Sequence, residues 1–354
     1  MKKAILSTLL VLLYLSASAQ RNTVNEPIRN FEVLWSTFNE RYANFELKKV
    51  DWQAVYEKYR PQIHASSTNE ELYLISCAML QELKDGHVSL DPGFEDEIDC
   101  GPPYHFLYDE LLASEEDQKQ FKGLMEKSFR TYGFSDPVFY EVSEETHFQY
   151  RLSENFAYLR LDEMTERFPL NKLKQALDAS FEQFEGKQGL IIDLRFNGGG
   201  WDVAAYKIAA RLVNQKILGH YKKQRIKGTN SFGKLKPFYL KPEGNVQFTR
   251  PVVILTSDYT ASAAEVFLLA LKELPHIKLV GDTTEGIFSD MYEFKLPNNW
   301  EVSLSHQQFF SRDMLNYEGK GIPPDFNVVN AKGDKVDVVL EKGLEVLTQA
   351  QTNE

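Results

Sequence analysis

The chain has 354 residues and carries 40 basic against 51 acidic side chains, a formal net charge of −11 at pH 7. This acidic balance argues against a nucleic-acid partner, because binding to nucleic acid rests largely on basic side chains that neutralise phosphates. After the first residues, no stretch of sequence is long and apolar enough to span a bilayer, so we expect no stable membrane insertion.

The N-terminal residues have the pattern of a secretory signal peptide. Two lysines precede an apolar run at residues 9–13, and small residues up to Ala19 follow it. We predict that residues 1–19 form the signal peptide, with cleavage after Ala19. The mature protein is therefore expected to be exported, either to a periplasm or out of the cell.

Residues 20–90 are predicted to form a small helical region, because apolar residues recur there at the spacing of one helix face. The first set is Phe31, Leu34, Trp35, Phe38 and Tyr42, and the second is Leu72, Ile75, Met79 and Leu83. Cys77 lies on the second pattern. It could pair with Cys100 in an oxidising compartment or be a buried thiol, and the sequence leaves both open. Two thiols without a cluster of histidines do not make a metal site.

The rest of the chain divides near residue 152. Residues 91–151 mix acidic stretches with an amphipathic piece and are predicted as an insert of undefined structure. Residues 152–345 alternate short apolar strands with helices, which is typical of an α/β core built from βαβ units. The strands are expected near 156–161, 189–194, 251–256 and 277–280, and the helices near 171–184, 202–212 and 263–271. The polar stretch at 222–245 is predicted as a loop inserted in this core.

Ser262 is the first candidate catalytic residue. It follows the apolar strand and short polar turn that begin at residue 251, and it opens the helix-like stretch that begins at Ala263. A hydroxyl at this place lies beside the unpaired amides and the positive dipole end of a helix, which can stabilise a developing oxyanion. Taken alone, a serine here is far more often a helix N-cap than a nucleophile.

A glycine-rich turn follows the strand at 189–194, with the sequence Asp193-Leu194-Arg195-Phe196-Asn197-Gly198-Gly199-Gly200. Glycines let the backbone turn sharply and present its amides, so this turn is a candidate oxyanion hole. It has neither the dinucleotide-binding nor the P-loop spacing, and a plain strand-to-helix turn is the alternative. Asp193 and Arg195 are expected to brace the turn, because buried charges need partners.

Four motifs in order carry a resemblance to a known family. They are Asp193 to Gly200, then Thr260-Ala261-Ser262-Ala263-Ala264-Glu265, then Gly281-x-x-Thr284-x-Gly286, then Gly321-Ile322-Pro323-Pro324-Asp325. Together they resemble the C-terminal processing protease and tricorn-core family of serine peptidases. The resemblance implies a ClpP/crotonase-like spiral α/β core and hydrolysis of peptide bonds through Ser262, without a metal or cofactor.

The resemblance also implies a general base. Tail-processing members place a lysine directly after the Gly-x-x-Thr-x-Gly motif, where this chain has Ile287, so a Ser/Lys dyad at that site is excluded. Tricorn-like members use a histidine from the N-terminal region, and Lys84-Asp85-Gly86-His87 resembles that motif. They also use a glutamate shortly before the Gly-x-x-Pro-Asp motif, where this chain has Glu318. The implied arrangement is Ser262, His87 and Glu318.

In this arrangement the oxyanion is held by backbone amides of Ala263 and of Gly198, Gly199 or Gly200. Read locally, His87 could be a residue at a helix C-terminus and Glu318 a solvated loop acid. His306 is a rival base, although its strand-like surroundings favour a packing role. Ser89 and Thr284 are expected to donate hydrogen bonds behind the site. No PDZ domain is evident in residues 91–151, so specificity for free C-termini is unsupported.

Three functions follow from these observations. The first is an exported serine peptidase acting on peptides or unfolded protein segments. The second is a non-catalytic binder of peptides or apolar ligands on the same scaffold, because a fold does not guarantee a chemistry. The third is a crotonase-type acyl-CoA enzyme, against which the signal peptide argues. The sequence does not set the oligomeric state.

Overall fold

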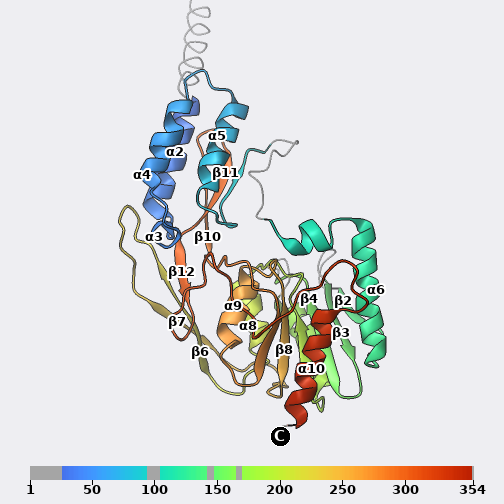
Figure 1. The fold of residues 1–354 in the computed structure, drawn as a ribbon. Helices are drawn as coiled ribbons and strands as arrows, with labels where there is room; N and C mark the ends of the chain where they lie inside the picture. Colours follow the sequence, from blue (N-terminus) through green and yellow to red (C-terminus); the bar gives the residue numbers. More distant parts are fainter. Residues whose placement is uncertain (1–25, 94–103, 142–146, 165–169, 353–354) are drawn as a thin grey trace, which may run out of the picture. The chain divides into compact units, whose positions relative to one another are not determined.

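The computed structural model describes residues 26–93, 104–141, 147–164 and 170–352 (Figure 1). The predicted signal peptide at residues 1–19 and Cys100 lie outside these residues. The chain forms two compact units, which are described in turn. The first comprises Met1–Pro103, Gln224–Gly233 and Asp290–Gln307, and the second comprises Tyr104–Lys223, Lys234–Ser289 and Gln308–Glu354.

Helices make up most of the first unit, as predicted for residues 20–90. They are α2 (Glu26–Arg41), α3 (Phe45–Lys48), α4 (Trp52–Tyr59), the 3-10 turn η1 (Arg60–Gln62) and α5 (Asn69–Gln81). The α5 helix begins with a capping box in which Thr68 and Glu71 exchange side-chain and backbone hydrogen bonds. The two predicted apolar faces pack against each other in one buried cluster. Cys77 is buried on α5 and is disulfide-bonded.

A small antiparallel sheet completes the first unit. Its strands, in the order β1-β11-β10, are β1 (Ser89–Asp91), β11 (Glu301–Ser305) and β10 (Met291–Lys295). Leu90 on β1 pairs with Val302 on β11, so a segment from late in the chain joins the N-terminal helices. The sequence analysis predicted a boundary at residue 90 and assigned residues 152–345 to the core. It did not predict that β10 and β11 belong to the first unit, because β1 and β11 are far apart in sequence.

The second unit is built on a seven-stranded sheet in the order β13-β9-β8-β5-β4-β3-β2. The strands β4 (Phe156–Leu161), β5 (Gly189–Asp193), β8 (Val252–Thr256), β9 (Ile277–Gly281) and β13 (Phe326–Asn327) are parallel. The strands β2 (Val138–Glu141) and β3 (His147–Leu152) extend the sheet with antiparallel pairing. The α/β fold class and the four expected strands are confirmed. The parallel strands end at one edge, where ligand sites of α/β folds lie.

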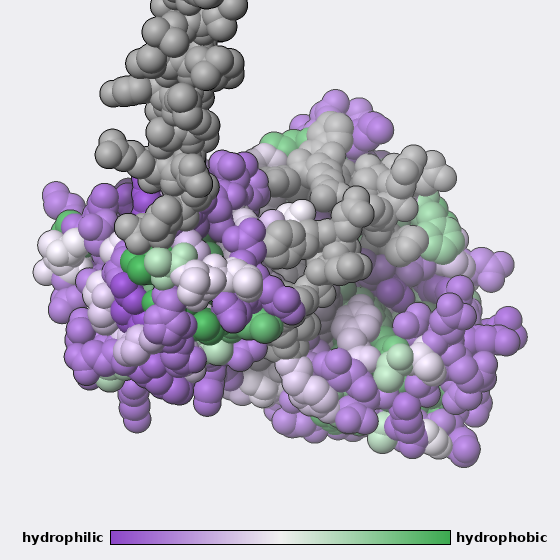
Figure 2. Space-filling model, turned by 90° about the horizontal axis from the view of Figure 1, so that it is seen from above, coloured by the Kyte–Doolittle hydropathy of each residue, from purple (hydrophilic) through white to green (hydrophobic). Residues whose placement is uncertain are grey.

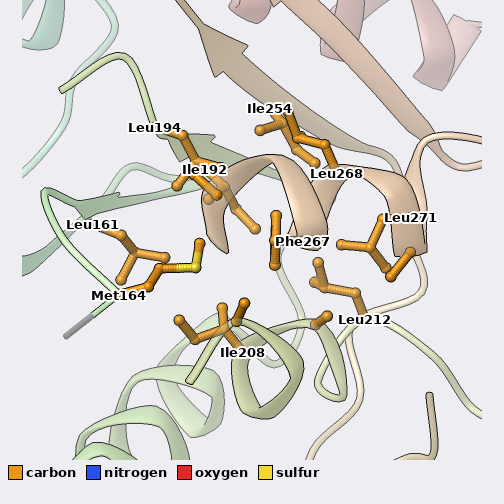
Figure 3. Close-up of a cluster of buried hydrophobic side chains, with 14 of the residues drawn as sticks. Leu161, Met164, Ile192, Leu194, Ile208, Leu212, Ile254, Phe267, Leu268 and Leu271 are labelled. Carbon is orange, nitrogen blue, oxygen red and sulfur yellow. The ribbon is translucent and has the colours of Figure 1, made fainter. Parts of the chain in front are cut away.

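Helices cover both faces of this sheet, because alternate strand residues point to opposite sides. On β5, Leu190 and Ile192 belong to one buried cluster with residues of α7 (Leu170–Phe184), α8 (Asp202–Ala209) and α9 (Ala263–Leu271). Figure 3 shows Ile192 in this cluster near Ile208 of α8 and Phe267 of α9. Ile191 packs on the other side with α6 (Glu115–Thr131) and α10 (Val338–Thr352). Every residue of α9 is buried, so the position of its first turn is fixed by packing.

Two segments differ from their predictions. Residues 91–151, for which the sequence indicated no fold, supply the π-helical turn η2 (Phe106–Leu111), then α6, β2 and β3. The prediction of a loop throughout 222–245 is wrong in part, because β6 (Ile217–Gln224) and β7 (Lys236–Leu240) form an antiparallel hairpin there. The residues between these strands and those at 241–245 belong to no named strand. The third strand of that sheet is β12 (Gln307–Phe310). Much of the hairpin is only partly buried, and lysines occupy several of its positions. Its sequence therefore lacks the clear alternation of apolar and polar residues by which a strand is predicted.

The surface is mainly hydrophilic on the face seen in Figure 2, with hydrophobic residues in small groups. Among the helices of the described residues, none combines the length and the apolar character that crossing a bilayer requires.

Candidate active site

Ser262 lies at the N-cap position of α9, at the carboxyl edge of the seven-stranded sheet. Its backbone has φ 53° and ψ −119°, whereas an N-cap residue usually has extended dihedrals. A non-glycine residue with positive φ costs on the order of 1–3 kcal/mol, and such strain clusters at functional sites. The helix N-cap alone therefore does not explain this residue.

Gly199 lies directly against Ser262. A Cβ atom built on Gly199 would lie 2.6 Å from the Ser262 Cβ and 2.9 Å from the Ala261 carbonyl oxygen. The φ of Gly199 is 110°, a region that side chains with a Cβ rarely adopt. Only glycine fits at position 199, because any side chain there would clash with Ser262 and its neighbours.

Three hydrogen bonds join the glycine-rich turn to the turn that carries Ser262. The Ser257 hydroxyl donates to the Arg195 carbonyl at 2.6 Å, and the Thr260 hydroxyl donates to the Leu194 carbonyl at 2.9 Å. The Ala261 amide donates to the carbonyl of Asn197 at 3.1 Å. Leu194, Arg195 and Asn197 thus each accept a hydrogen bond from the turn after β8, and these bonds hold the two turns together.

The predicted oxyanion donors are not equivalent. The Gly199 amide donates to the Asn197 side-chain oxygen at 2.9 Å, and the Asn197 amide group in turn donates to the Leu161 carbonyl at 2.9 Å. Because the Gly199 N–H already donates to Asn197, it is not free to bind an oxyanion. The Ala263 nitrogen lies 3.1 Å from a Cβ built on Gly199, so its amide borders the space beside the serine. Gly198 and Gly200 are exposed and remain candidates with Ala263.

Glu265, on the first turn of α9, is fully buried and accepts four hydrogen bonds. The donors are the Ser262 amide at 3.1 Å, the Thr284 hydroxyl at 2.5 Å, and the Gly286 and Ile287 amides at 2.8 Å each. Burial raises the pKa of this carboxyl to about 8, although the bonds from Thr284 and the two amides oppose the shift. Glu265 thus ties the Ser262 backbone to the Gly-x-x-Thr-x-Gly motif.

Glu318 lies on the adjoining segment and is 3% exposed, so the interpretation as a solvated loop acid is wrong. Its carboxylate accepts a hydrogen bond from the Phe288 amide at 3.0 Å, and the Gly319 amide donates to the Gly286 carbonyl at 2.7 Å. Phe288 directly follows Ile287, which binds Glu265. Ile287 itself is buried and offers no base at the position where tail-processing members have lysine.

His87 belongs to the first unit and is buried there. Its amide donates to the Asp85 carboxylate at 3.0 Å, and its carbonyl accepts from the Ser303 hydroxyl at 2.7 Å. The Ser89 and Ser303 hydroxyls are themselves 2.7 Å apart, so Ser89 contributes to the support behind His87. Asp85 also accepts from the Tyr42 hydroxyl at 2.8 Å. The His87 backbone is therefore anchored, and its pairing with Ser262 stays a prediction.

His306, the rival base, is also in the first unit. It lies between β11 and β12 and is half-buried. Its Nδ1 lies 2.9 Å from the Asp290 carbonyl, and its own carbonyl accepts from the Arg225 amide at 3.1 Å. These backbone contacts tie His306 to the residue before β10 and to the residue after β6.

Asp193 and Arg195 brace the glycine-rich turn, as predicted. The guanidinium of Arg195 binds both Asp193 and Asp337, with nitrogen–oxygen distances of 2.7 Å and 2.8 Å, and all three side chains are buried. Burial alone would lower the pKa of Arg195, but the two carboxylate charges outweigh burial and raise it well above its usual value. The same guanidinium keeps the pKa of Asp193 below its usual value despite burial.

Comparison with known proteins identifies the family of the chain. The model of Peptidase family S41 matches residues 155–328, and the Tricorn protease C1 domain matches residues 24–81. The chain belongs to peptidase family S41. It is 27% identical over 187 residues to the carboxy-terminal processing protease CtpA of Bacillus subtilis, which is 52% of this chain and 37% of that protein. It is 29% identical over 149 residues to the tricorn protease of Thermoplasma acidophilum, 42% of this chain and 12% of that protein.

The region that matches therefore spans well under half the length of these two relatives. A crystal structure from Parabacteroides merdae, named as a candidate peptidase, superposes with a TM-score of 0.74 at 27% identity and covers 91% of this chain and 96% of its own. Mature CPAF superposes with a TM-score of 0.68 over 94% of this chain and 98% of its own, but at 11% identity this match shows the fold alone.

Sequence reasoning missed two residues that contact the segments around Ser262 and Thr284. Glu265 follows Ser262 by three residues, the spacing of a capping box, and that pattern could have assigned it to the Ser262 amide. His105 binds Glu285 at 3.1 Å, and this bond raises the pKa of His105. No motif marks His105, because its partner lies far along the chain.

Proposed function

We propose that this S41 chain is a serine peptidase that cleaves peptides or unfolded protein segments through an acyl-enzyme on Ser262. His87 acts as the general base, and Glu318 orients the imidazole. The observation that carries the proposal is the strained backbone of Ser262 at the start of a buried helix, with the Gly199 backbone packed against its side chain. A helix N-cap has no need of this arrangement.

The chemistry follows from these groups. A serine hydroxyl is a weak nucleophile until a base takes its proton, and an imidazole suits this task near neutral pH. Ser262 attacks the peptide carbonyl while His87 accepts the proton and then delivers it to the leaving amine. Water, activated by the same imidazole, releases the acyl group. The amide of Ala263, with Gly198 or Gly200, stabilises the oxyanion.

Export and substrate class are parts of the same proposal. The signal-peptide pattern at residues 1–19 supports export. The names of the relatives, carboxy-terminal processing protease and tricorn protease, support a peptide or protein substrate. The matched region of the S41 model includes Ser262 and Glu318.

The decisive experiment is labelling of the folded protein with a fluorophosphonate, which reacts with activated serines, followed by mass spectrometry of the labelled peptide. We expect labelling at Ser262 that is lost in Ser262→Ala and reduced by a factor on the order of 10² to 10⁴ in His87→Ala. The matched control is His64→Ala, which removes an exposed histidine of the same unit and should label normally.

Each outcome separates the candidates. Normal labelling of His87→Ala would refute the assigned base and redirect attention to His306. Labelling that survives in Glu318→Gln within twofold would remove Glu318 from the arrangement. If well-folded protein does not label at Ser262 even with peptides present, the catalytic proposal fails and the non-catalytic binder takes its place.

A further inference from the structure

A cavity of about 540 Å³ lies between α6 and the strands β2, β3 and β4 of the second unit. We call it the α6 pocket. Its volume is within the range of small-molecule and side-chain binding sites, roughly 300–1,000 Å³. The buried wall is aromatic and apolar, and it includes Phe121, Met125, Phe129, Tyr158 and Phe196.

Two aromatic residues of the pocket lining remain open to solvent. Phe139 on β2 is 57% exposed, and Tyr108 on η2 is 37% exposed. An exposed phenylalanine beside an apolar cavity retains surface that a ligand could bury.

The charged residues in the lining occur largely as pairs. Arg151 binds Glu126 and lies over the Phe129 ring, 4.3 Å from its centroid. Arg160 binds Asp162 and lies over the Phe196 ring at 4.1 Å. An acidic ligand would have to compete with these carboxylates, whereas an apolar or aromatic group meets ring faces and paired guanidinium planes. The pocket therefore favours an aromatic or large aliphatic group.

The pocket reaches the edge of the sheet where Ser262 lies. Strands β4, β5 and β8 are parallel, so Asp162, Phe196 and Ser262, which follow them, lie at one edge. Contacts connect the two places. The Tyr108 ring lies 4.5 Å from the Tyr259 ring, and the Tyr259 hydroxyl is 2.9 Å from a Cβ built on Gly198. Gly198 adjoins the glycine that packs against Ser262.

We propose that the α6 pocket is a substrate subsite that receives bulky apolar, above all aromatic, side chains of a peptide bound at Ser262. The proposal rests on the peptidase function proposed above and names the substrate class of that site. A peptide advances at most about 3.3–3.6 Å per residue, so a side chain some positions from the cleaved bond would enter the pocket. Binding there adds selectivity for segments that a folded protein would keep buried.

The test uses internally quenched peptides of glycine and serine in which a single phenylalanine is moved one position at a time. We expect wild-type protein to show an optimum at one position, with kcat/KM raised about tenfold or more over the peptide without phenylalanine. Phe139→Ala should reduce this preference at least about threefold, and Met125→Trp, which fills the cavity, should abolish it. Circular dichroism and Tm confirm that each variant is folded.

The control is Tyr239→Ala, which removes an aromatic side chain of similar exposure, 48%, on β7. It should keep the wild-type optimum. An optimum that persists in both pocket variants, or the absence of any optimum in a wild type that labels at Ser262, would overturn the pocket assignment alone. Binding of a fluorescent fatty acid is measured on the same proteins. If the two pocket variants lose this binding but keep the wild-type peptide preference, the pocket binds a lipid and the subsite assignment is overturned. A wild type that neither labels at Ser262 nor cleaves any peptide would overturn both proposals.

Discussion

Gly199→Ala tests whether the glycine-rich turn positions the serine. The new Cβ would lie 2.6 Å from the Ser262 Cβ, 2.9 Å from the Ala261 oxygen and 3.1 Å from the Ala263 nitrogen, so the two turns must separate. Backbone strain at φ 110° costs on the order of 1–3 kcal/mol, and overpacking adds on the order of 1–3 kcal/mol. We expect the free energy of unfolding to fall by about 2–6 kcal/mol. A serine displaced by about 1 Å should lose on the order of 10² in labelling rate.

Gly123→Ala is the matched control, because a Cβ at Gly123 meets nothing within 4 Å. Gly123 lies inside α6, where alanine should stabilise the protein by roughly 0.5–1 kcal/mol. Urea unfolding followed by tryptophan fluorescence measures both changes, and fluorophosphonate labelling measures the serine. A Gly199→Ala protein with wild-type stability and a wild-type labelling rate would refute the close packing of the two turns.

Three further changes probe the network around the site. Asp337→Asn removes one carboxylate from buried Arg195 and should lower the free energy of unfolding by about 3 kcal/mol in urea titrations. Burial raises the pKa of Glu265 from 4.5 to about 8, so the folded state holds its proton more tightly, and this contribution to stability should fall as pH rises through that range. Glu265→Gln should remove that slope, which unfolding at several pH values measures. His105 has its pKa raised by Glu285, so His105→Gln should destabilise the protein more at pH values below about 6.5 than above the folded pKa.

Much of the second unit could be predicted because its signals are local. The strands around Ile191 and Val253 are short, wholly buried and largely apolar runs, and the helices between them show a regular apolar spacing. Ser262 at the start of α9 and the buried pair of Asp193 with Arg195 follow from the same local logic. Each feature depends on residues within one turn or one strand.

The elements that escaped prediction depend on distant partners. The β1 strand is three residues long and is defined by β11, near the other end of the chain. Asp337, which completes the pairing of Arg195, lies just before α10 and carries no motif. Pairing between residues so far apart in the chain produces no repeating pattern of residues that a sequence analysis could detect. Sequence patterns could therefore suggest His87 as a base but could not place its anchor at Ser303.

The structure also explains why three of the sequence motifs occur together. The Glu265 carboxylate accepts hydrogen bonds from Ser262 and from three groups of the Gly-x-x-Thr-x-Gly segment and its next residue, Ile287. The Thr284 hydroxyl also accepts from the Ile322 amide, within the Gly-Ile-Pro-Pro-Asp motif. Removing the carboxylate would leave several buried donors without an acceptor, each at a cost of about 1–3 kcal/mol. The motifs thus describe one hydrogen-bonded structure behind the serine, in which the backbone of Ser262 is held by the buried residues Glu265, Thr284 and Ile322.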